Sequence, residues 1–220
     1  FFDPTATYLK KHGVDFFTSY AALNIPNDTD AIVIGKHSKL TEENPEVTAA
    51  FASGKKIYSL PSFLAQQIKD RTQIVIAGSF GKSTCTGLTS WILEKNETHP
   101  GYFVGGEVHK MESSAMFGQP PYFIIEGDEY PSANFDDQAK FLHFNPNILM
   151  LTSAEHDHVN VFPTLESYLK PYKELIRKMP ANGIIIACDH GAHLHKLLRY
   201  APCKVLWYGH TEYCDYQIQS

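Results

Sequence analysis

The 220-residue sequence has few cysteines, no long apolar run and no excess of positive charge. Its four cysteines form no CxxC pair and no regular framework, which argues against a disulfide-stapled secreted domain and favours a reduced, cytoplasmic setting. No apolar run approaches the roughly 20 residues of a membrane-spanning helix, and no signal peptide is visible. A net charge of −5 disfavours a nucleic-acid-binding surface. The sequence therefore predicts a cytoplasmic protein whose partners are neither nucleic acid nor membrane.

What is present is the composition of an ordinary globular protein, 43% hydrophobic and 20% charged, with enough length for one large or two ordinary domains. Short apolar runs alternate with longer amphipathic stretches. The predicted strands are residues 31–34, 56–60, 73–77, 122–125, 148–151, 184–187 and 204–207, and the predicted helices are residues 4–12, 45–53, 81–95, 165–178 and 192–200. This alternation predicts an α/β fold with a mostly parallel sheet.

A polar patch at residues 69–72 marks the expected domain boundary. Residues 1–70 would form a small, partial Rossmann-like α/β domain, and residues 71–220 would form a second domain. Because the chain opens on Phe1 rather than methionine, we expect its native start to lie upstream.

Residues 77–96, AGSFGKSTCTGLTSWILEKN, read as the end of a strand, a glycine-bounded loop and a helix. Gly78 and Gly81 permit a tight turn that brings N–H groups close to oxyanions, and the helix N-terminus adds a positive dipole end. Lys82 supplies a full positive charge, and Ser83 can place its hydroxyl on the Mg²⁺ of a nucleoside triphosphate. The loop is shorter than the commonest phosphate loop, G-x-x-x-x-G-K-[ST]. A plain turn is the alternative, but a plain turn does not need Lys-Ser-Thr at the start of the helix.

Acidic and imidazole side chains follow two further predicted strands. The text E-G-D-E-Y at 126–130 follows one strand, and E-H-D-H at 155–158 follows another. The carboxyl ends of parallel strands meet at one edge, where open α/β sheets bind ligands. One such cluster alone is equally compatible with a solvated loop, but two beside a phosphate loop favour metal and phosphate chemistry. Because Mg²⁺ prefers carboxylate and water, Glu126 is its predicted ligand.

A zinc site is the alternative for the histidine-rich text C-D-H-G-A-H-L-H at residues 188–195, together with His156 and His158. These spacings match no common structural zinc pattern. His193 and His195 would also point to different faces of a helix. We therefore expect solvated or helix-capping histidines in this segment.

These landmarks, in this order, resemble the Mur ligases, the ATP-dependent amide-bond-forming enzymes of bacterial cell-wall synthesis. The phosphate loop of that family is commonly G-T-[HN]-G-K-[TS]-[ST]; here it consists of Gly78, Ser79, Phe80, Gly81, Lys82, Ser83 and Thr84. The text at 34–38 and 43–45 resembles the later half of the family's UDP-binding domain, and G-Y-F-V-G-G at 101–106 resembles a segment of its central domain.

Within the family, the text I-E-G-D-E-Y at 125–130 and the residues that follow it most resemble the peptide-recycling ligases. These join UDP-N-acetylmuramate to the tripeptide L-alanyl-γ-D-glutamyl-meso-diaminopimelate. The L-alanine-adding ligases share the loop and are the alternative within the family. A P-loop phosphotransferase or switch NTPase is an alternative of another class, but it would carry an aspartate where Glu126 stands. A scaffold without activity is a third reading, for which Phe80, in place of a polar residue, is the hint.

The resemblance implies ATP and Mg²⁺ as cofactors. Lys82 and Ser83 would hold the phosphates and the first Mg²⁺, Glu126 would complete that ion's shell, and His158 would bind a second Mg²⁺. Candidate substrate-binding residues are Lys36, His37, Ser38, Gly105, Gly106, Asp128 and Glu129. Candidate supporting residues are Glu155, Asp157 and Lys173, the last because some family members carry a carbamylated lysine fifteen residues beyond that histidine.

The implied reaction passes through an acyl phosphate. The carboxylate of UDP-N-acetylmuramate attacks the γ-phosphate of ATP, and the amine of a peptide or amino acid then displaces phosphate. Residues 1–70 would be part of the UDP-substrate domain and residues 71–220 the ATP-binding central domain. The family's C-terminal domain is expected to be absent, so this stretch alone is expected to bind nucleotide without turnover. The sequence predicts no particular oligomeric state.

Overall fold

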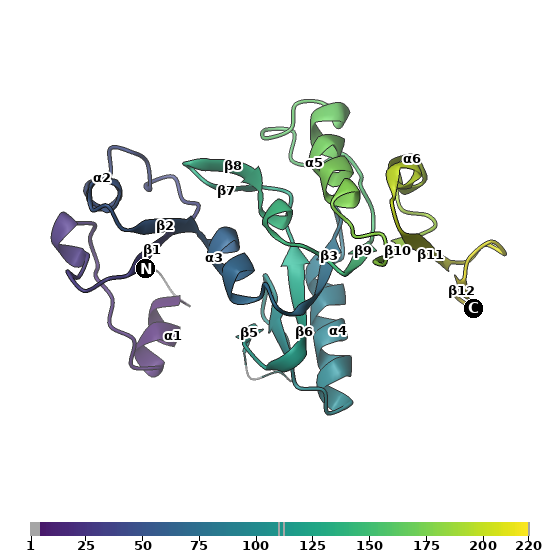
Figure 1. Cartoon of the computed structure of the whole chain (residues 1–220), viewed down its shortest axis with the longest axis horizontal. Helices are drawn as coiled ribbons and strands as arrows, with labels where there is room; N and C mark the ends of the chain where they lie inside the picture. Colours follow the sequence, from purple (N-terminus) through teal and green to yellow (C-terminus); the bar gives the residue numbers. More distant parts are fainter. Residues whose placement is uncertain (1–4, 110, 112, 220) are drawn as a thin grey trace. The chain divides into compact units, whose positions relative to one another are not determined.

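The computed structural model describes residues 5–109, 111 and 113–219, which form two compact units (Figure 1). Unit 1 takes the chain up to Leu60 together with Ala133–Asp136, and unit 2 takes Pro61–Ser132 and the chain from Asp137 onward. The division after Leu60 lies on the N-terminal side of the boundary predicted from the polar patch at residues 69–72. The reason is α3 (Leu60–Gln67), whose apolar side packs on the main core of unit 2.

Unit 1 is a small α/β unit. Its elements are α1 (Thr5–Lys11), η1 (Ala22–Asn24), β1 (Ala31–Ile34), α2 (Pro45–Ala52) and β2 (Lys56–Ser59). The strands pair in parallel. Helix α2 begins where the Asn44 side chain accepts hydrogen bonds from the N–H groups of Glu46 and Val47. Its buried face meets β1 through Ile34, Val47 and Ala50, which form the core of the unit.

Unit 2 is built on one eight-stranded sheet. The strands are β3 (Thr72–Ala77), β4 (Pro100–Phe103), β5 (Ala115–Met116), β6 (Gln119–Gly127), β9 (Ile148–Leu151), β10 (Ile184–Cys188), β11 (Lys204–Gly209) and β12 (Tyr216–Gln217). Their order is β12-β11-β10-β9-β3-β6-β4-β5, and every neighbouring pair is parallel except β4–β5. Strands β7 (Pro131–Ala133) and β8 (Asp136–Ala139) pair separately. The predicted α/β fold with a mostly parallel sheet is confirmed.

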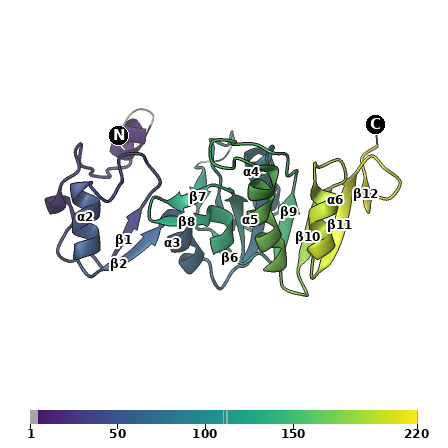
Figure 2. The same ribbon diagram turned by 90° about the horizontal axis from the view of Figure 1, so that it is seen from above.

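Helices cover both faces of this sheet (Figure 2). They are α4 (Lys82–Lys95), α5 (Leu165–Arg177) and α6 (Leu194–Leu197), with the short turns η2 (Lys140–His143) and η3 (Leu198–Tyr200). Alternate residues of β3 point to opposite sides. Val75 lies in the core that α5 and α6 complete, whereas Ile74 and Ile76 lie in the core beneath α4. The central strands are therefore buried on both faces, as their unbroken apolar runs predict.

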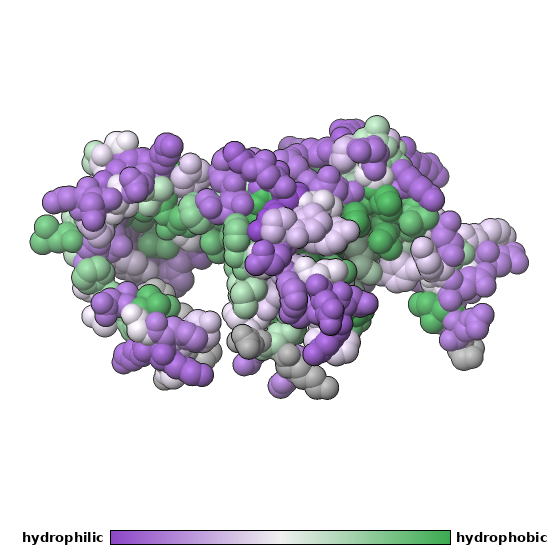
Figure 3. Space-filling view, turned by 60° about the horizontal axis from the view of Figure 1, so that its bottom comes forward, coloured by the Kyte–Doolittle hydropathy of each residue, from purple (hydrophilic) through white to green (hydrophobic). Residues whose placement is uncertain are grey.

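Each predicted strand and helix is present, with ends displaced by a few residues. The helix predicted at 192–200 is divided into α6 and η3, and Pro4, at the start of the first predicted helix, lies outside the described residues. The elements that no sequence pattern predicted are α3, β4, β5, β7, β8 and β12. Hydrophilic residues cover much of the visible face of each unit (Figure 3). Within the described ranges, no helix has the length and apolar character needed to cross a membrane.

Candidate functional site

The candidate site of unit 2 lies at the carboxyl end of β3, between β6 and β9. Ala77 of β3 stands level with Gly127 of β6 and Leu151 of β9. The loops that follow these strands therefore begin side by side. Two of them are joined directly, because the Thr152 hydroxyl donates a hydrogen bond of 2.6 Å to the Phe80 carbonyl. The phosphate loop thus lies at the sheet edge where an open parallel sheet binds its ligand.

The backbone of the phosphate loop requires both of its glycines. Gly78 has φ +142°, and a Cβ atom there would lie 2.0 Å from Thr152 Oγ1 and 2.9 Å from the Ser153 backbone. Gly81 has φ +79° and precedes the first turn of α4 in the left-handed conformation. Substitution at either position therefore strains the loop.

Lys82, the first residue of α4, forms an ion pair with Glu129. Its Nζ atom lies 3.0 Å from Glu129 Oε2, with the two side chains 14% and 0% exposed. The other carboxylate oxygen, Oε1, is buried and accepts no hydrogen bond from the described residues, although His158 Nε2 lies 3.4 Å away. A buried carboxylate with one unsatisfied oxygen beside an imidazole is suited to receiving a cation.

His158 is held in an uncommon backbone conformation. Its φ of +56° lies in the left-handed region, which few residues other than glycine adopt. Asp157 supports this turn, because its Oδ1 accepts a 2.6 Å hydrogen bond from the His158 N–H and its Oδ2 lies 3.5 Å from Nε2. The Tyr130 ring packs on the imidazole with 4.5 Å between centroids. These contacts direct the imidazole toward Glu129.

Ser83 and Glu126 are also brought together. The Ser83 hydroxyl donates a 2.9 Å hydrogen bond to Glu126 Oε1, and the Gly105 N–H donates one of 2.7 Å to Oε2. A Cβ atom on Gly105 would lie 2.9–3.1 Å from this carboxylate, so the close approach requires glycine. The hydrogen-bond partners of the Glu126 carboxylate are thus Ser83 and Gly105, whereas His158 lies beside Glu129 and Asp157. Two carboxylates therefore flank the loop, Glu126 beside Ser83 and Glu129 beside Lys82.

Other predicted site residues of unit 2 have different surroundings. Asp128 Oδ2 lies 2.6 Å from the ammonium group of Lys140, which ties the loop after β6 to η2. Glu155 is exposed and contributes its carbonyl group rather than its carboxylate, accepting from Ser79 Oγ at 2.7 Å. Phe80 is 57% exposed at the loop. Thr84 and Gly106 are less constrained: Thr84 is exposed, and a Cβ atom on Gly106 would meet open space.

The predicted substrate residues Lys36, His37 and Ser38 follow β1 in unit 1. Lys36 Nζ donates to the Ala133 carbonyl at 3.3 Å, and the His37 carbonyl accepts from Asn134 Nδ2 at 2.8 Å. Ser38 is exposed. His37 also lines a cavity of about 810 Å³ within unit 1. Lys36 and His37 therefore have contacts internal to unit 1.

Two buried tyrosines of α5, absent from the sequence-based prediction, complete the site. Tyr172 Oη lies 3.5 Å from Glu129 Oε2, and Tyr168 Oη lies 3.2 Å from Tyr172 Oη and 2.8 Å from Ser79 Oγ. Burial raises the pKa of Tyr168 to about 12 and the pKa of Tyr172 well above its usual value, so both stay protonated at neutral pH. Their i, i+4 spacing, which places them on one helix face, was the available signal. Lys173, next along the helix, has no recorded contact with Glu129 in the described ranges.

Side chains of the histidine-rich segment have hydrogen-bond and ion-pair partners within the protein. Across the described residues, no three His, Cys, Asp or Glu side chains come together as metal ligands. Asp189 accepts from Thr211 Oγ1 at 2.9 Å, and His195 Nε2 lies 3.2 Å from the same carboxylate. His156 Nε2 lies 2.8 Å from the Phe162 carbonyl. The zinc alternative has no support here. Magnesium differs, because it is commonly held by one or two carboxylates together with phosphate oxygens and waters.

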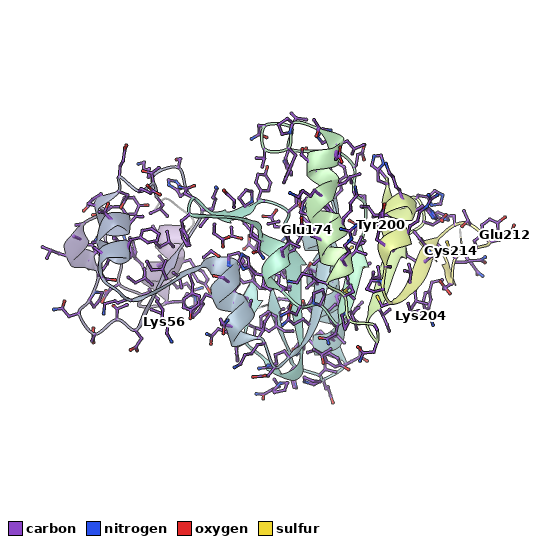
Figure 4. The ribbon with its side chains drawn as sticks, turned by 45° about the horizontal axis from the view of Figure 1, so that its top comes forward. Lys56, Glu174, Tyr200, Lys204, Glu212 and Cys214 are labelled. Carbon is purple, nitrogen blue, oxygen red and sulfur yellow. The ribbon has the colours of Figure 1, made fainter. Side chains whose placement is uncertain are left out.

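A cavity of about 780 Å³ opens beside Glu129 and follows α5. Its lining carries charges of both signs, including Lys170, Glu174 and Arg177. Glu174 is shown on α5 in Figure 4. Glu129 is thus among the residues that line this cavity, although its carboxylate is fully buried.

The phosphate loop, the two flanking carboxylates and the imidazole are thus arranged around one end of the parallel sheet. Residues 76–219 match the family model of the Mur ligase middle domain. The chain belongs to the Mur ligase family.

Several curated Mur ligases are similar to this chain in sequence. The UDP-N-acetylmuramate--L-alanyl-gamma-D-glutamyl-meso-2,6-diaminoheptandioate ligase of Escherichia coli (strain K12) is 33% identical over 198 residues, 90% of this chain and 43% of that protein. Its namesake from Haemophilus influenzae is 32% identical over 187 residues, 84% of this chain and 41% of that protein. The UDP-N-acetylmuramate--L-alanine ligase of Desulforamulus reducens is 31% identical over 197 residues, 89% of this chain and 41% of that protein. The chain therefore spans less than half the length of these relatives.

Solved Mur ligases have the same fold. The crystal structure of the UDP-N-acetylmuramate:L-alanyl-gamma-D-glutamyl-meso-diaminopimelate ligase from Neisseria meningitides matches with a TM-score of 0.88 at 27% identity, over 97% of this chain and 69% of that one. A murein peptide ligase from Psychrobacter arcticus matches with a TM-score of 0.81 at 25% identity, over 94% of this chain and 46% of that one.

Proposed function

We propose that this Mur ligase chain is the nucleotide-binding part of an ATP-dependent ligase that joins UDP-N-acetylmuramate to a cell-wall peptide. The observation that carries the proposal is the convergence of cationic, hydroxyl, carboxylate and imidazole groups at the carboxyl end of β3. These groups belong to Lys82, Ser83, Glu126, Glu129 and His158. The names of the Escherichia coli and Haemophilus influenzae relatives support the choice of substrates.

The loop and its helix supply positive charge where a triphosphate would lie. Gly81 sits at the N-terminus of the 14-residue α4, whose first N–H groups have no partners within the helix. Those N–H groups and the Lys82 ammonium group attract phosphate oxygens. Lys82 pairs with Glu129, so phosphate binding would exchange one anionic partner for another.

The flanking residues fit magnesium. Ser83 and Glu126 offer a hydroxyl and a carboxylate 2.9 Å apart. Glu129 offers, beside His158, a buried oxygen that accepts no hydrogen bond from the described part of the chain. These groups would hold one ion on each side of Lys82. Mg²⁺, when bound, neutralises phosphate oxygens and aligns the reacting groups for in-line transfer.

The reaction that this site would serve joins two anions before it forms the amide. The substrate carboxylate attacks the γ-phosphate of ATP, giving an acyl phosphate and ADP, and the peptide amine then displaces phosphate. Bringing a carboxylate to a polyanion is opposed by charge repulsion, so the contribution of Lys82 and the helix terminus is to lower that repulsion. The chain's own groups act by position and charge, without covalent bonding to the substrate.

A second candidate function uses the same acyl-phosphate chemistry but takes L-alanine, rather than a peptide, as the amine substrate. The Desulforamulus reducens relative adds L-alanine according to its name, and its identity to this chain is similar. A phosphate-release assay separates the two, using a polypeptide of the relatives' full length that contains this chain. We expect release with ATP, Mg²⁺, UDP-N-acetylmuramate and the tripeptide, and little release when L-alanine replaces the tripeptide. The reverse preference would favour the L-alanine ligase, and release without UDP-N-acetylmuramate would contradict both.

A further inference from the structure

A chain of buried hydroxyl groups links the phosphate loop to Glu129. It runs from Ser79 Oγ to Tyr168 Oη over 2.8 Å, from there to Tyr172 Oη over 3.2 Å, and on to Glu129 Oε2 over 3.5 Å. Ser79 is 8% exposed, and the two tyrosines and Glu129 are fully buried. The partners at the loop end lie 89 residues apart in sequence, so the connection exists only in the folded chain.

The direction of these hydrogen bonds follows from the Ser79 end of the chain. Ser79 Oγ lies 2.7 Å from the Glu155 carbonyl, which can only accept, so the Ser79 proton is donated there. Ser79 must then accept from Tyr168, and Tyr168 in turn accepts from Tyr172. The Tyr172 proton is therefore the one in this chain that can turn either to Tyr168 or to Glu129.

Aromatic packing fixes the two tyrosine rings. The Tyr172 ring meets the Phe141 ring edge-on at 5.2 Å, and the Tyr168 ring meets those of Phe162 at 5.4 Å and His156 at 5.8 Å. The two tyrosine rings lie 5.4 Å apart. Because both rings are enclosed in this way, their hydroxyl groups hold fixed positions beneath the site.

We propose that Tyr168 and Tyr172 are positioning residues that orient Glu129 for metal binding when the nucleotide arrives. When Lys82 turns to a phosphate, Glu129 Oε2 loses its ion-pair partner at 3.0 Å. The Tyr172 hydroxyl lies 3.5 Å from this oxygen, and its donated hydrogen bond keeps the carboxylate turned toward His158. When Tyr172 turns its proton to Glu129, Tyr168 can turn its own proton from Ser79 to Tyr172, and this hydrogen bond holds Tyr172 in the donating position. This inference rests on the proposed function, since it requires Mg²⁺ and nucleotide to bind at the loop.

The test compares ATP binding by calorimetry in Mg²⁺ and in EDTA for the wild-type chain, Tyr172→Phe and Tyr168→Phe. Phenylalanine keeps the packing and removes only the hydroxyl. Tyr102→Phe is the matched control, because Tyr102 is 4% exposed and lies in the core beneath α4, on the other face of the sheet. We expect Tyr172→Phe to weaken Mg²⁺-dependent binding about tenfold and Tyr168→Phe about threefold, as for other residues that support a metal ligand. Binding in EDTA should stay within about twofold of wild type, as should both values for Tyr102→Phe.

The difference between the affinity losses in Mg²⁺ and in EDTA distinguishes a positioning role of the tyrosines from a merely structural one. Equal losses in Mg²⁺ and in EDTA would overturn the inference, because the tyrosines would then support only the loop. Affinities equal to those of Tyr102→Phe would overturn it too. If the wild-type chain shows no Mg²⁺-dependent binding, the proposed function fails and this inference with it; wild-type binding with unaffected variants defeats the inference alone. Circular dichroism establishes that each variant is folded, and Tyr168→Phe carries the test if Tyr172→Phe is not.

Discussion

Glu129 is the central residue of the candidate site, because it lies fully buried between Lys82 and His158. From the sequence, Glu126 was predicted to be a magnesium ligand and Glu129 to be a substrate-binding residue. In the structure each carboxylate takes one side of the loop, and the buried one pairs with the loop lysine. Glu126 lies near the end of β6 and Glu129 comes three positions later, just after the strand, so the sequence alone could not separate their roles.

The ion pair between Lys82 and Glu129 should stabilise the fold. Lys82→Met leaves a buried carboxylate without its cation, so we expect the free energy of unfolding to fall by about 2–4 kcal/mol. Glu129→Gln in the same background should restore part of that loss, because the uncompensated charge is removed. Urea unfolding of the two single variants and the double variant measures the coupling. Strictly additive effects would show that the pair contributes nothing.

The raised pKa of Tyr168, caused chiefly by burial, makes stability depend on alkaline pH. Because the folded state binds this proton more tightly than the unfolded state, its contribution is complete below pH 10 and is lost as pH rises toward 12. We expect up to about 3 kcal/mol of the free energy of unfolding to disappear over that interval. Tyr168→Phe should show a shallower decline in denaturant titrations at the same pH values. An unchanged decline in the variant would contradict this assignment, since Tyr172 and Glu129 remain in place.

Among the secondary-structure elements, those determined by a local sequence pattern could be predicted. The apolar runs of the central strands and the G-x-x-G-K-S-T loop were recognised because their patterns are contiguous. Strand β4 was missed because it begins with Pro100 and Gly101, which are poor strand formers. Gly101 is required by its neighbours, since a Cβ atom there would lie 2.3 Å from the Phe123 ring. Because this requirement comes from Phe123 of another strand, no local sequence pattern predicts glycine at position 101.

The loop after β4 offers a sharp comparison between adjacent glycines. A Cβ atom on Gly105 would lie 2.9 Å from Glu126 Oε2, whereas one on Gly106 would meet open space. We expect Gly105→Ala to displace Glu126 from Ser83 and to weaken Mg²⁺–ATP binding about tenfold, with Gly106→Ala within about twofold of wild type. Calorimetry on both variants measures this. Equal affinities would mean that the hydrogen bond from Gly105 to Glu126 does not position the carboxylate.

At the scale of the whole molecule, the two units differ greatly in their cores. Unit 1 buries three apolar residues around a two-stranded sheet, whereas the main core of unit 2 extends from α3 through α5 to α6. The alternation of strands and helices in the sequence predicted an α/β fold for each unit. The hydroxyl chain beneath the site could not be predicted, because Ser79 and Tyr168 meet only through the packing of α5 on the sheet.

This difference predicts unequal local stability. Amide hydrogen exchange should be slowest in β3 and β9, which are bordered by strands and covered by core, and much faster in β1 and β2. Mass spectrometry of exchanged peptides measures this directly. Equal protection in the two sets of strands would show that unit 1 has a stability that its small core does not explain.

The most direct test of the central claim is calorimetric titration of ATP into the chain in the presence of Mg²⁺. Lys82→Met is the test variant, and Lys95→Met, at the exposed far end of the same helix, is its control. We expect binding by the wild-type chain and by Lys95→Met, and an affinity at least about tenfold weaker, equivalent to about 1.4 kcal/mol, for Lys82→Met. Equal affinities for Lys82→Met and Lys95→Met, or no binding by the wild-type chain, would contradict it.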